Sequence, residues 1–386
     1  MQSLLAEPAQ TAPDRPVVPP AGRPWRSALL AALAVWSAIT VTHLAVMALA
    51  GLPRGGRIPD LLLSLNGWDA GHYVRIAESG YHLGPGFPAF FPLYPLLIHL
   101  TGGTPLSALF VANAAAFGAL AVLHRLAAHE FGPAVAQRAT WYLAAFPTGF
   151  FLFIGYNESL FILLAVGALY AGRRGHWWLA GALGALSSAT RLFGLLLMVP
   201  LAIEYLRQRR RLGPDVLSLA LIPLGVVAYA VYCAIELGNP LAFSAAQDQW
   251  GRRYTFPGEA WLIAVRQMGG HHLRDKATLA AILDTGTILI AVVLLILCVA
   301  GPFKFRRDQL YLVVQGAITL ALLMSTEVGG RSMQSAARYA MEAVAIFLVL
   351  ARMGANQIVD RSVLVIGIAL HAVFLVIFMA GTFLVG

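Results

Sequence analysis

The chain has 386 residues, of which 59% are hydrophobic and only 12% are charged. Soluble domains carry about 25% charged residues, so this composition excludes an ordinary soluble globular protein. The formal net charge of +9 is explained mostly by arginines beside membrane-spanning segments, not by affinity for nucleic acid. The apolar runs are continuous instead of alternating, which favours helices over a barrel. The predicted fold is therefore all-α, a polytopic transmembrane helical bundle.

Residues 1–26 are polar and proline-rich, and we predict a disordered cytoplasmic tail. The apolar run that follows is too long for the core of a signal peptide and is expected to form an uncleaved first span. Residues 27–386 are then expected to form a single transmembrane domain. The length rule of about 17–25 residues predicts about eleven spans. They are expected at residues 27–50, 105–128, 138–154, 157–172, 176–190, 192–207, 215–237, 284–302, 309–326, 338–352 and 362–384.

The arginines predict the orientation of these spans. With the N-terminus in the cytoplasm, the cytoplasmic segments hold 16 of the 27 basic residues, most of them in short loops. The sequences "RQRRR" and "KFRR" are the densest of these segments, and they favour topology and contact with anionic lipids over a catalytic role. The opposite, extracytoplasmic side then receives a first loop at 51–104, a second long loop at 238–283 and a short connection near 327–337.

Asp69 is the leading catalytic candidate in the first loop. It follows Trp68 in "GWDAGHYVRIAESGY" and could simply cap the helix that begins there. Against that reading, Asp69, His72, Tyr73 and Ile76 are spaced three and four residues apart, so they share one helical face. A carboxylate among such groups, partly screened from water, is suited to general-base catalysis.

A proline-rich aromatic segment, "FPAFFPLYPLL", follows this helix. Pro88, Pro92 and Pro95 prevent a long regular helix. The segment is typical of the aromatic belt at a membrane surface, and it could also form a wall for a lipid-linked substrate. Both interpretations stay open.

The second long loop contains "FSAAQDQWGRRY" and then "EAWLIAVRQM", which is predicted to lie along the membrane surface as an amphipathic helix. Arg252 and Arg253 could bind a phosphate or could contact lipid headgroups. Arg338 lies at the outer start of a predicted span, where it could extend to the interface or clamp a lipid phosphate.

The sequence lacks the motifs of several other classes. It contains no Walker A motif, no Rossmann glycine fingerprint, no zinc-type spacing of cysteine and histidine, and no Gly-x-Ser-x-Gly elbow. His271 and His272 are adjacent but make only a weak metal signal. Cys233 and Cys298 both fall in apolar runs and are expected to be core residues without a disulfide. No cofactor is predicted, and a divalent ion is left open.

Several motifs together resemble a known family. "WDAGHYVRIAESGY" with "FFPLYPLL" resembles the signature of the PIG-V family, the mannosyltransferases that add the second mannose in GPI-anchor synthesis, and its bacterial relatives. "YNESLFILL", "ATRLFGLLLMVPLAIEY", "AQDQWGR" and "SAARY" follow in the same order, so the resemblance covers most of residues 60–350. One departure is that "SAARYAMEAVAIF" carries Met341 and Glu342, which puts the local helix geometry and the acceptor in doubt.

The resemblance implies a polytopic glycosyltransferase of the GT-C class. Such enzymes take mannose from polyprenyl- or dolichyl-phosphate on the extracytoplasmic side and place an essential acid in the first large outer loop, which corresponds to Asp69. We therefore expect an inverting mannosyltransferase with Asp69 as general base and Arg338 beside the leaving phosphate. The other expected substrate-binding residues are Trp68, His72, Tyr73, Arg75, Asn157, Glu158, Arg191, Gln247, Trp250, Arg252, Arg253 and Tyr339.

Two other functional classes fit the same composition. One is a transporter or flippase of lipids or lipid-linked sugars, and the other is a non-catalytic subunit of a glycosyltransferase complex. The expected partners are the sugar donor, a lipid or glycan acceptor and membrane lipids, without nucleic acid. The expected location is a bacterial plasma membrane, or the endoplasmic reticulum if the protein is eukaryotic. The acceptor, the linkage and the oligomeric state are not predicted.

Overall fold

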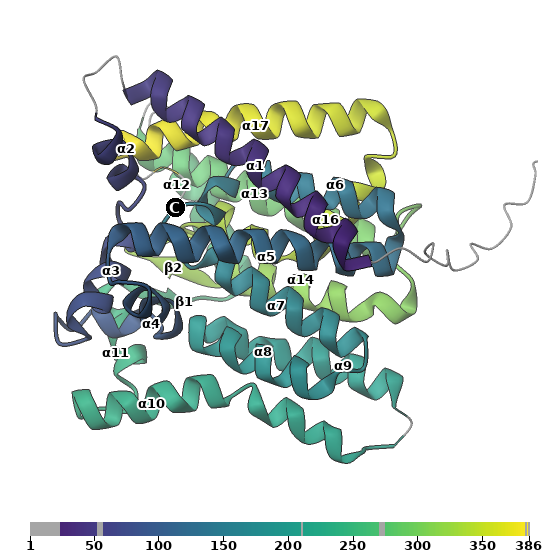
Figure 1. Ribbon diagram of the computed structural model, residues 1–386, viewed down its shortest axis with the longest axis horizontal. Helices are drawn as coiled ribbons and strands as arrows, with labels where there is room; N and C mark the ends of the chain where they lie inside the picture. The colour runs from purple at the N-terminus through teal and green to yellow at the C-terminus, as the bar shows by residue number, and fades with distance from the viewer. Residues whose placement is uncertain (1–23, 52–56, 210, 270–274, 383, 385–386) are drawn as a thin grey trace, which may run out of the picture.

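The computed structural model describes residues 24–51, 57–209, 211–269, 275–382 and 384. The tail predicted over residues 1–26 lies outside the described residues except for its last three, which begin the first helix. Long helices run roughly side by side, and short elements gather at one end of them, on the left in Figure 1. The predicted all-α polytopic class is confirmed, with one small sheet as the exception.

The elements follow one another as the printed bounds show. The α-helices are α1 (Pro24–Gly51), α2 (Ile58–Ser64), α3 (Asp69–Ser79), α4 (Leu93–Leu100), α5 (Pro105–Phe131), α6 (Pro133–Ala144), α7 (Glu158–Arg173), α8 (Trp177–Thr190), α9 (Met198–Gln208), α10 (Leu224–Leu237), α11 (Ala242–Gln249), α12 (Pro257–Gly269), α13 (Lys276–Val299), α14 (Leu310–Leu323), α15 (Ala336–Tyr339), α16 (Val344–Met353) and α17 (Gln357–Met379). The 3₁₀ helices are η2 (Phe87–Ala89), η3 (Gly149–Leu152), η4 (Leu192–Leu197), η5 (Pro214–Leu221), η6 (Arg307–Gln309) and η7 (Ala340–Glu342).

Helices occur at each predicted span, but the count of eleven spans is not confirmed. Among the described residues, α1, α5, α13 and α17 are long and apolar enough to cross a membrane. A fifth span results if η5 and α10, bent by 44°, are taken together. Helices such as α9 with 11 residues and α7 with 16 are only about 17–24 Å long, short of the roughly 30 Å hydrocarbon core.

Three predicted spans are interrupted where the sequence analysis expected one continuous helix. The predicted span at 138–154 divides into α6 and η3, with Pro147 between them. The one at 192–207 divides into η4 and α9, and the one at 338–352 into α15, η7 and α16. Apolar length alone did not register these breaks, because each of them occurs inside an apolar run.

The helix α7 lies at the centre of the bundle. It packs against α5 and α8, and α5 in turn packs against α1 and α6. Thirteen of the 16 residues of α7 are buried, as expected for a helix that is covered on all sides. Its first residue, Glu158, is therefore held in the interior.

Arginines and acids from the predicted cytoplasmic loops meet at the far end of α7. Arg173 bonds Glu130 at 2.5 Å, Asp308 at 2.6 Å and Glu204 at 3.1 Å, and so ties four segments together. With 16 residues, α7 places this network about 24 Å from Glu158. The predicted alternation of loops between two ends is thus reproduced, while the end that faces the cytoplasm stays a prediction.

A small antiparallel sheet joins the second long loop to the connection near 327–337. Its strands are β1 (Arg252–Tyr254), β2 (Thr326–Val328) and β3 (Arg331–Ser332), in the order β1-β2-β3. The sequence analysis did not predict these strands, which are only two or three residues long. The predicted surface helix in the same loop is formed as α12. His271 and His272, the weak metal signal, lie outside the described residues.

The two cysteines behave as expected from their apolar surroundings. Cys233 in α10 and Cys298 in α13 are both free and buried. The prediction of core residues without a disulfide is confirmed.

Candidate active site

A cavity of about 370 Å³ opens at the end of the bundle where the short elements gather. It is bounded by α3, the aromatic segment at η2, the turn between α8 and η4, α11, the sheet and α15. Eleven of the fourteen predicted site residues line it, namely Trp68, Asp69, His72, Tyr73, Asn157, Arg191, Gln247, Trp250, Arg252, Arg338 and Tyr339. Loops far apart in the sequence therefore meet at one place.

Asp69 projects into this cavity from the first turn of α3. The interpretation of Asp69 as the cap residue of the helix is wrong, because Trp68 occupies the cap position and Asp69 is the first helical residue. Trp68 has a φ of 59°, a strained conformation for a residue with a side chain. The Asp69 carboxylate is 28% exposed and accepts a 3.0 Å hydrogen bond from Nη1 of Arg338. The strained turn delivers a partly accessible carboxylate to the cavity.

The predicted shared face of α3 is present. Asp69, His72 and Tyr73 line the cavity, and Ile76 is buried beneath them in a cluster with Phe91. The His72 ring is surrounded by Phe87, Phe90 and Trp250, with ring centroids 5.1–5.4 Å away.

The surroundings of His72 determine its protonation. Burial is the largest influence and lowers the pKa of His72; Asp69 raises it and Arg75 lowers it. The imidazole is therefore neutral at pH 7, and its Nδ1 atom is buried without a hydrogen-bond partner. In this structure the hydrogen bond to Asp69 comes from Arg338, whereas the sequence analysis had considered His72 for that orienting role.

Five side chains of alternating charge form a chain behind the cavity wall. Arg338 pairs with Asp69 and also lies 3.2 Å from Oε1 of Glu158. The same Glu158 oxygen pairs with Arg191, which in turn pairs with Glu342. Glu158 is fully buried, and the side chains of Arg338 and Glu342 are each 3% exposed. Each buried charge thus has an opposite neighbour, as buried ions require.

Local structure explains how these charges are held. Glu158 begins α7, and the preceding Asn157 accepts a 2.9 Å hydrogen bond from Nε of Arg191. Arg191 leaves the helical conformation at the end of α8, so its side chain turns back toward α7. Tyr339 lies beneath both guanidinium groups, 4.8 Å from Arg191 and 4.5 Å from Arg338. These cation–π contacts add to the fixed orientation of the two cations.

The far wall of the cavity comes from α11 and β1. Gln247 and Trp250 lie on or just after α11, and the Trp250 indole donates a 3.0 Å hydrogen bond to the Gly86 carbonyl. Arg252 lines the cavity, and its Nε atom is buried without a hydrogen-bond partner. Because successive strand residues point to opposite faces, the neighbouring Arg253 points away and is exposed. The sequence pair "RR" is therefore divided between two faces.

Three predicted residues do not line the cavity. Arg75 is exposed on α3 and packs over the Phe87 ring at 4.9 Å. Arg253 lies on the outer face of β1, opposite Glu327 of β2. Glu158 is buried behind the two arginines, so in this structure it contacts the cations of the site and does not face the space in which a sugar would lie.

The cavity also contains residues that sequence reasoning did not single out. They are Ala89, Phe90, Phe91, Thr190, Leu192, Phe193, Tyr254, Val328, Gln334 and Ser335. The two phenylalanines belong to the aromatic segment that was considered as a substrate wall. The others are neighbours in sequence of predicted residues or are brought in by the sheet, and no motif marked them.

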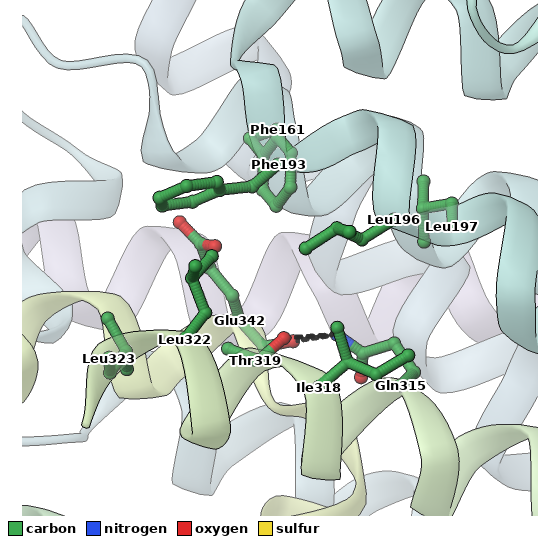
Figure 2. A pocket seen from close by; sticks show the side chains of 10 residues that line it. All are labelled: Phe161, Phe193, Leu196, Leu197, Gln315, Ile318, Thr319, Leu322, Leu323 and Glu342. Atoms are coloured by element: carbon green, nitrogen blue, oxygen red, sulfur yellow. Dashed lines mark hydrogen bonds between the residues drawn. The ribbon is translucent and has the colours of Figure 1, made fainter. Parts of the chain in front are cut away.

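A smaller recess lies on the other side of Phe193 (Figure 2). Apolar residues of η4 and α14 form most of it, including Leu196 and Leu322, and the Glu342 side chain points toward the Phe193 ring. Gln315 donates a 3.1 Å hydrogen bond to Thr319 on its floor. Phe193 therefore separates a polar cavity from an apolar recess.

Among the described residues, no group of three or more histidine, cysteine, aspartate and glutamate side chains is placed to hold a metal ion. The charges of the cavity are the carboxylate of Asp69 and the guanidinium groups of Arg191, Arg252 and Arg338. This set is suited to binding an anion beside a single acid that can exchange a proton.

Comparison with known proteins bears on the residues that build this site. Residues 57–209 match the family described as Mannosyltransferase (PIG-V). The chain is 32% identical over 225 residues to GPI alpha-1,6-mannosyltransferase 2 of Rattus norvegicus, which covers 53% of this chain and 44% of that protein. The same protein from Mus musculus is 35% identical and that from Homo sapiens 33%, each over 155 residues, which is 36% of this chain and 31% of theirs.

The match spans less than half of the length of these relatives. No solved structure matches the chain. The matched region contains Asp69, Glu158 and Arg191, while Arg338 lies beyond residue 209. The resemblance predicted from the motifs is confirmed: over residues 57–209, this chain is similar to the PIG-V mannosyltransferase family.

Proposed function

We propose that this protein is an integral membrane mannosyltransferase. It would move mannose from a polyprenyl- or dolichyl-phosphate carrier to a hydroxyl of a lipid-linked or glycan acceptor. The observation that carries the proposal is the Asp69–Arg338 pair in a cavity built largely by the segment similar to mannosyltransferases. The pair supplies the two groups that such a transfer needs, a proton acceptor and a cation for the departing phosphate.

The transfer would proceed with inversion at the sugar. Asp69 takes the proton from the acceptor hydroxyl as the hydroxyl oxygen attacks the anomeric carbon. The bond between that carbon and the phosphate oxygen breaks, and polyprenyl phosphate leaves with the bonding electrons. Arg338, with Arg191 and Arg252 on the same cavity, would stabilise the charge that develops on the phosphate. Asp69 is the one carboxylate among the described residues that line the cavity.

Donor binding would also activate the base. With the cavity as it stands, Arg338 bonds Asp69 at 3.0 Å and so disfavours protonation of the carboxylate. A donor phosphate competes for the same guanidinium, because Arg binds phosphate through two parallel hydrogen bonds. As Arg338 turns toward the phosphate, Asp69 becomes more basic. The base would thus be strongest when the donor is in place.

The surroundings of the cavity suit a lipid carrier. Phe90, Phe91 and Trp250 provide an aromatic wall on one side, and the apolar recess beyond Phe193 lies on the other. We place the cavity on the extracytoplasmic side and the N-terminus in the cytoplasm, because the arginine-rich loops lie at the opposite end. The protein would be a multi-pass protein of a plasma membrane.

The experiment is transfer of radiolabelled mannose by purified protein from polyprenyl-phosphate-mannose to a panel of lipid acceptors. Asp69→Asn should lower kcat by about 10²–10⁴-fold, the range for loss of a general base. Glu78→Gln is the matched control, because Glu78 is exposed on the same helix, and it should stay close to wild type. Turnover retained by Asp69→Asn would refute the role of Asp69.

A transporter is the second candidate, and the same preparation tests it. Lipid-linked sugar that crosses sealed vesicles containing wild-type protein, without transfer to any acceptor, would favour transport. The gathering of cavity charges at one end of the helices favours transfer, because a transport path needs polar groups through the membrane depth.

A further inference from the structure

The short helix α15 carries two residues of the site but makes few contacts of its own that could hold it. It comprises Ala336–Tyr339, four residues, and a single turn of helix is not stable by itself. Ser335 occupies its cap position with a φ of 65° and no side-chain cap, and Met333 two residues earlier has a φ of 55°. Such strained residues persist only where surrounding structure holds them. Arg338 therefore depends on anchors from elsewhere in the fold.

Two buried side chains bind the residue directly before Arg338. The backbone N–H of Ala337 donates a 2.8 Å hydrogen bond to Oδ1 of Asp284 in α13. The carbonyl of the same residue accepts a 2.8 Å hydrogen bond from the hydroxyl of Thr148, just before η3. Asp284 is 3% exposed and Thr148 is 1% exposed. Both polar groups of Ala337 are thus held by side chains from distant segments.

The position of Asp284 argues for a role beyond packing. It lies inside α13, one of the helices long and apolar enough to cross a membrane, where an acidic residue is costly. It does not line the cavity and is not part of the chain of charges from Asp69 to Glu342. An apolar residue would pack in its place at lower cost, but it would leave the Ala337 N–H without a partner.

We propose that Asp284 and Thr148 are positioning residues that set the place of the Arg338 guanidinium. They fix the Ala337 peptide, and this peptide directs the next side chain between Asp69 and Glu158. The proposal rests on the proposed mannosyl transfer, in which Arg338 meets the donor phosphate. A displacement of about 1 Å in such a group is enough to slow a reaction by roughly 10²-fold.

The kinetic test compares variants that keep the hydrogen bond with variants that lose it. Asp284→Ala should lower kcat/KM for polyprenyl-phosphate-mannose by about 10²-fold, while Asp284→Asn, whose amide oxygen still accepts from Ala337, should restore most of it. Thr148→Val should lower kcat/KM, and Thr148→Ser should restore it. Thr285→Val is the control, because Thr285 is buried beside Asp284 and its hydroxyl makes no hydrogen bond.

A double-mutant cycle separates positioning from general destabilisation. If Asp284 acts through Arg338, Asp284→Ala should have little further effect on kcat/KM once Arg338→Gln is present. A general structural role predicts instead that the two losses multiply. Equal kinetics for Asp284→Ala and wild type, or fully multiplied losses, would overturn the proposal.

A readout without turnover keeps the proposal testable if the protein transfers no sugar. A nitroxide attached at Gln334→Cys, beside α15, reports the order of this segment, and the native Cys233 and Cys298 are buried. The spectrum should show greater mobility in Asp284→Ala than in Asp284→Asn. Absence of transfer by wild type would refute the proposed function alone, whereas unchanged mobility in Asp284→Ala would refute the positioning role.

Discussion

Removing Arg191 should destabilise the protein more than removing an exposed arginine. Arg191 pairs with Glu158 and Glu342 and is bound by Asn157 through its Nε atom at 2.9 Å. After Arg191→Gln, Glu158 keeps its pair with Arg338 at 3.2 Å, but Glu342 loses its partner while it remains buried. The substitution therefore leaves one buried carboxylate uncompensated.

The expected magnitude follows from these contacts. An uncompensated buried charge costs about 3–5 kcal/mol, and loss of the hydrogen bond to Asn157 adds about 1 kcal/mol. The sum, about 4–6 kcal/mol, is a large part of the 5–15 kcal/mol that typically stabilises a domain. The measurement is titration with denaturing detergent in mixed micelles, followed by the fluorescence of the eight tryptophans. Arg266→Gln, at an exposed position on α12, is the control.

The companion variant Glu342→Gln shows whether this reasoning is correct. In the Arg191→Gln background it removes the uncompensated charge, so it should return about 3 kcal/mol of the lost stability. Two outcomes would refute the argument. One is that Arg191→Gln costs no more than Arg266→Gln, and the other is that the losses of Arg191→Gln and Glu342→Gln simply add.

Three further predictions concern other parts of the site and fold. Arg252→Gln should raise the KM for the donor by about tenfold or more, whereas Arg253→Gln on the outer face should change it little. Burial lowers the pKa of His72, so the unfolded chain binds the proton more readily and stability should fall as pH drops below about 6.5; His72→Gln should weaken that dependence in unfolding at pH 7.5 and 5.0. Gly225→Ala places a methyl group against the Ala185 carbonyl and should cost about 1–3 kcal/mol, while Gly286→Ala meets nothing within 4 Å and should be neutral or stabilising in the same unfolding assay.

The sequence predicted the class of the fold because membrane helices are written in uninterrupted apolar runs. A helix occurs at each predicted span, including α1 and α13. The number of spans did not follow, because composition does not show where a run bends or divides. Gly194 is an example: a methyl group there would collide with the backbone of Ser187, so η4 packs tightly against α8 where one continuous span was expected.

The candidate site was found to a large extent from local motifs. Asp69 and His72 were recognised because helical spacing and an uncommon cluster of polar groups mark them in an apolar chain. Arg191 and Arg338 were selected because charged residues near membrane depth are rare. What remained hidden was the pairing of these residues, since Asp69 and Arg338 are separated by 269 positions in the sequence.

The sequence by itself determined that this is a polytopic helical membrane protein and that its polar groups gather on one side. Both properties depend on composition and spacing, which are local. Only the tertiary structure decided that Arg252 and Arg253 face opposite ways, that Glu158 stands behind the arginines, and that Asp284 holds the helix of Arg338. These arrangements depend on strand pairing and on contacts between distant segments, and no local pattern of residues encodes them.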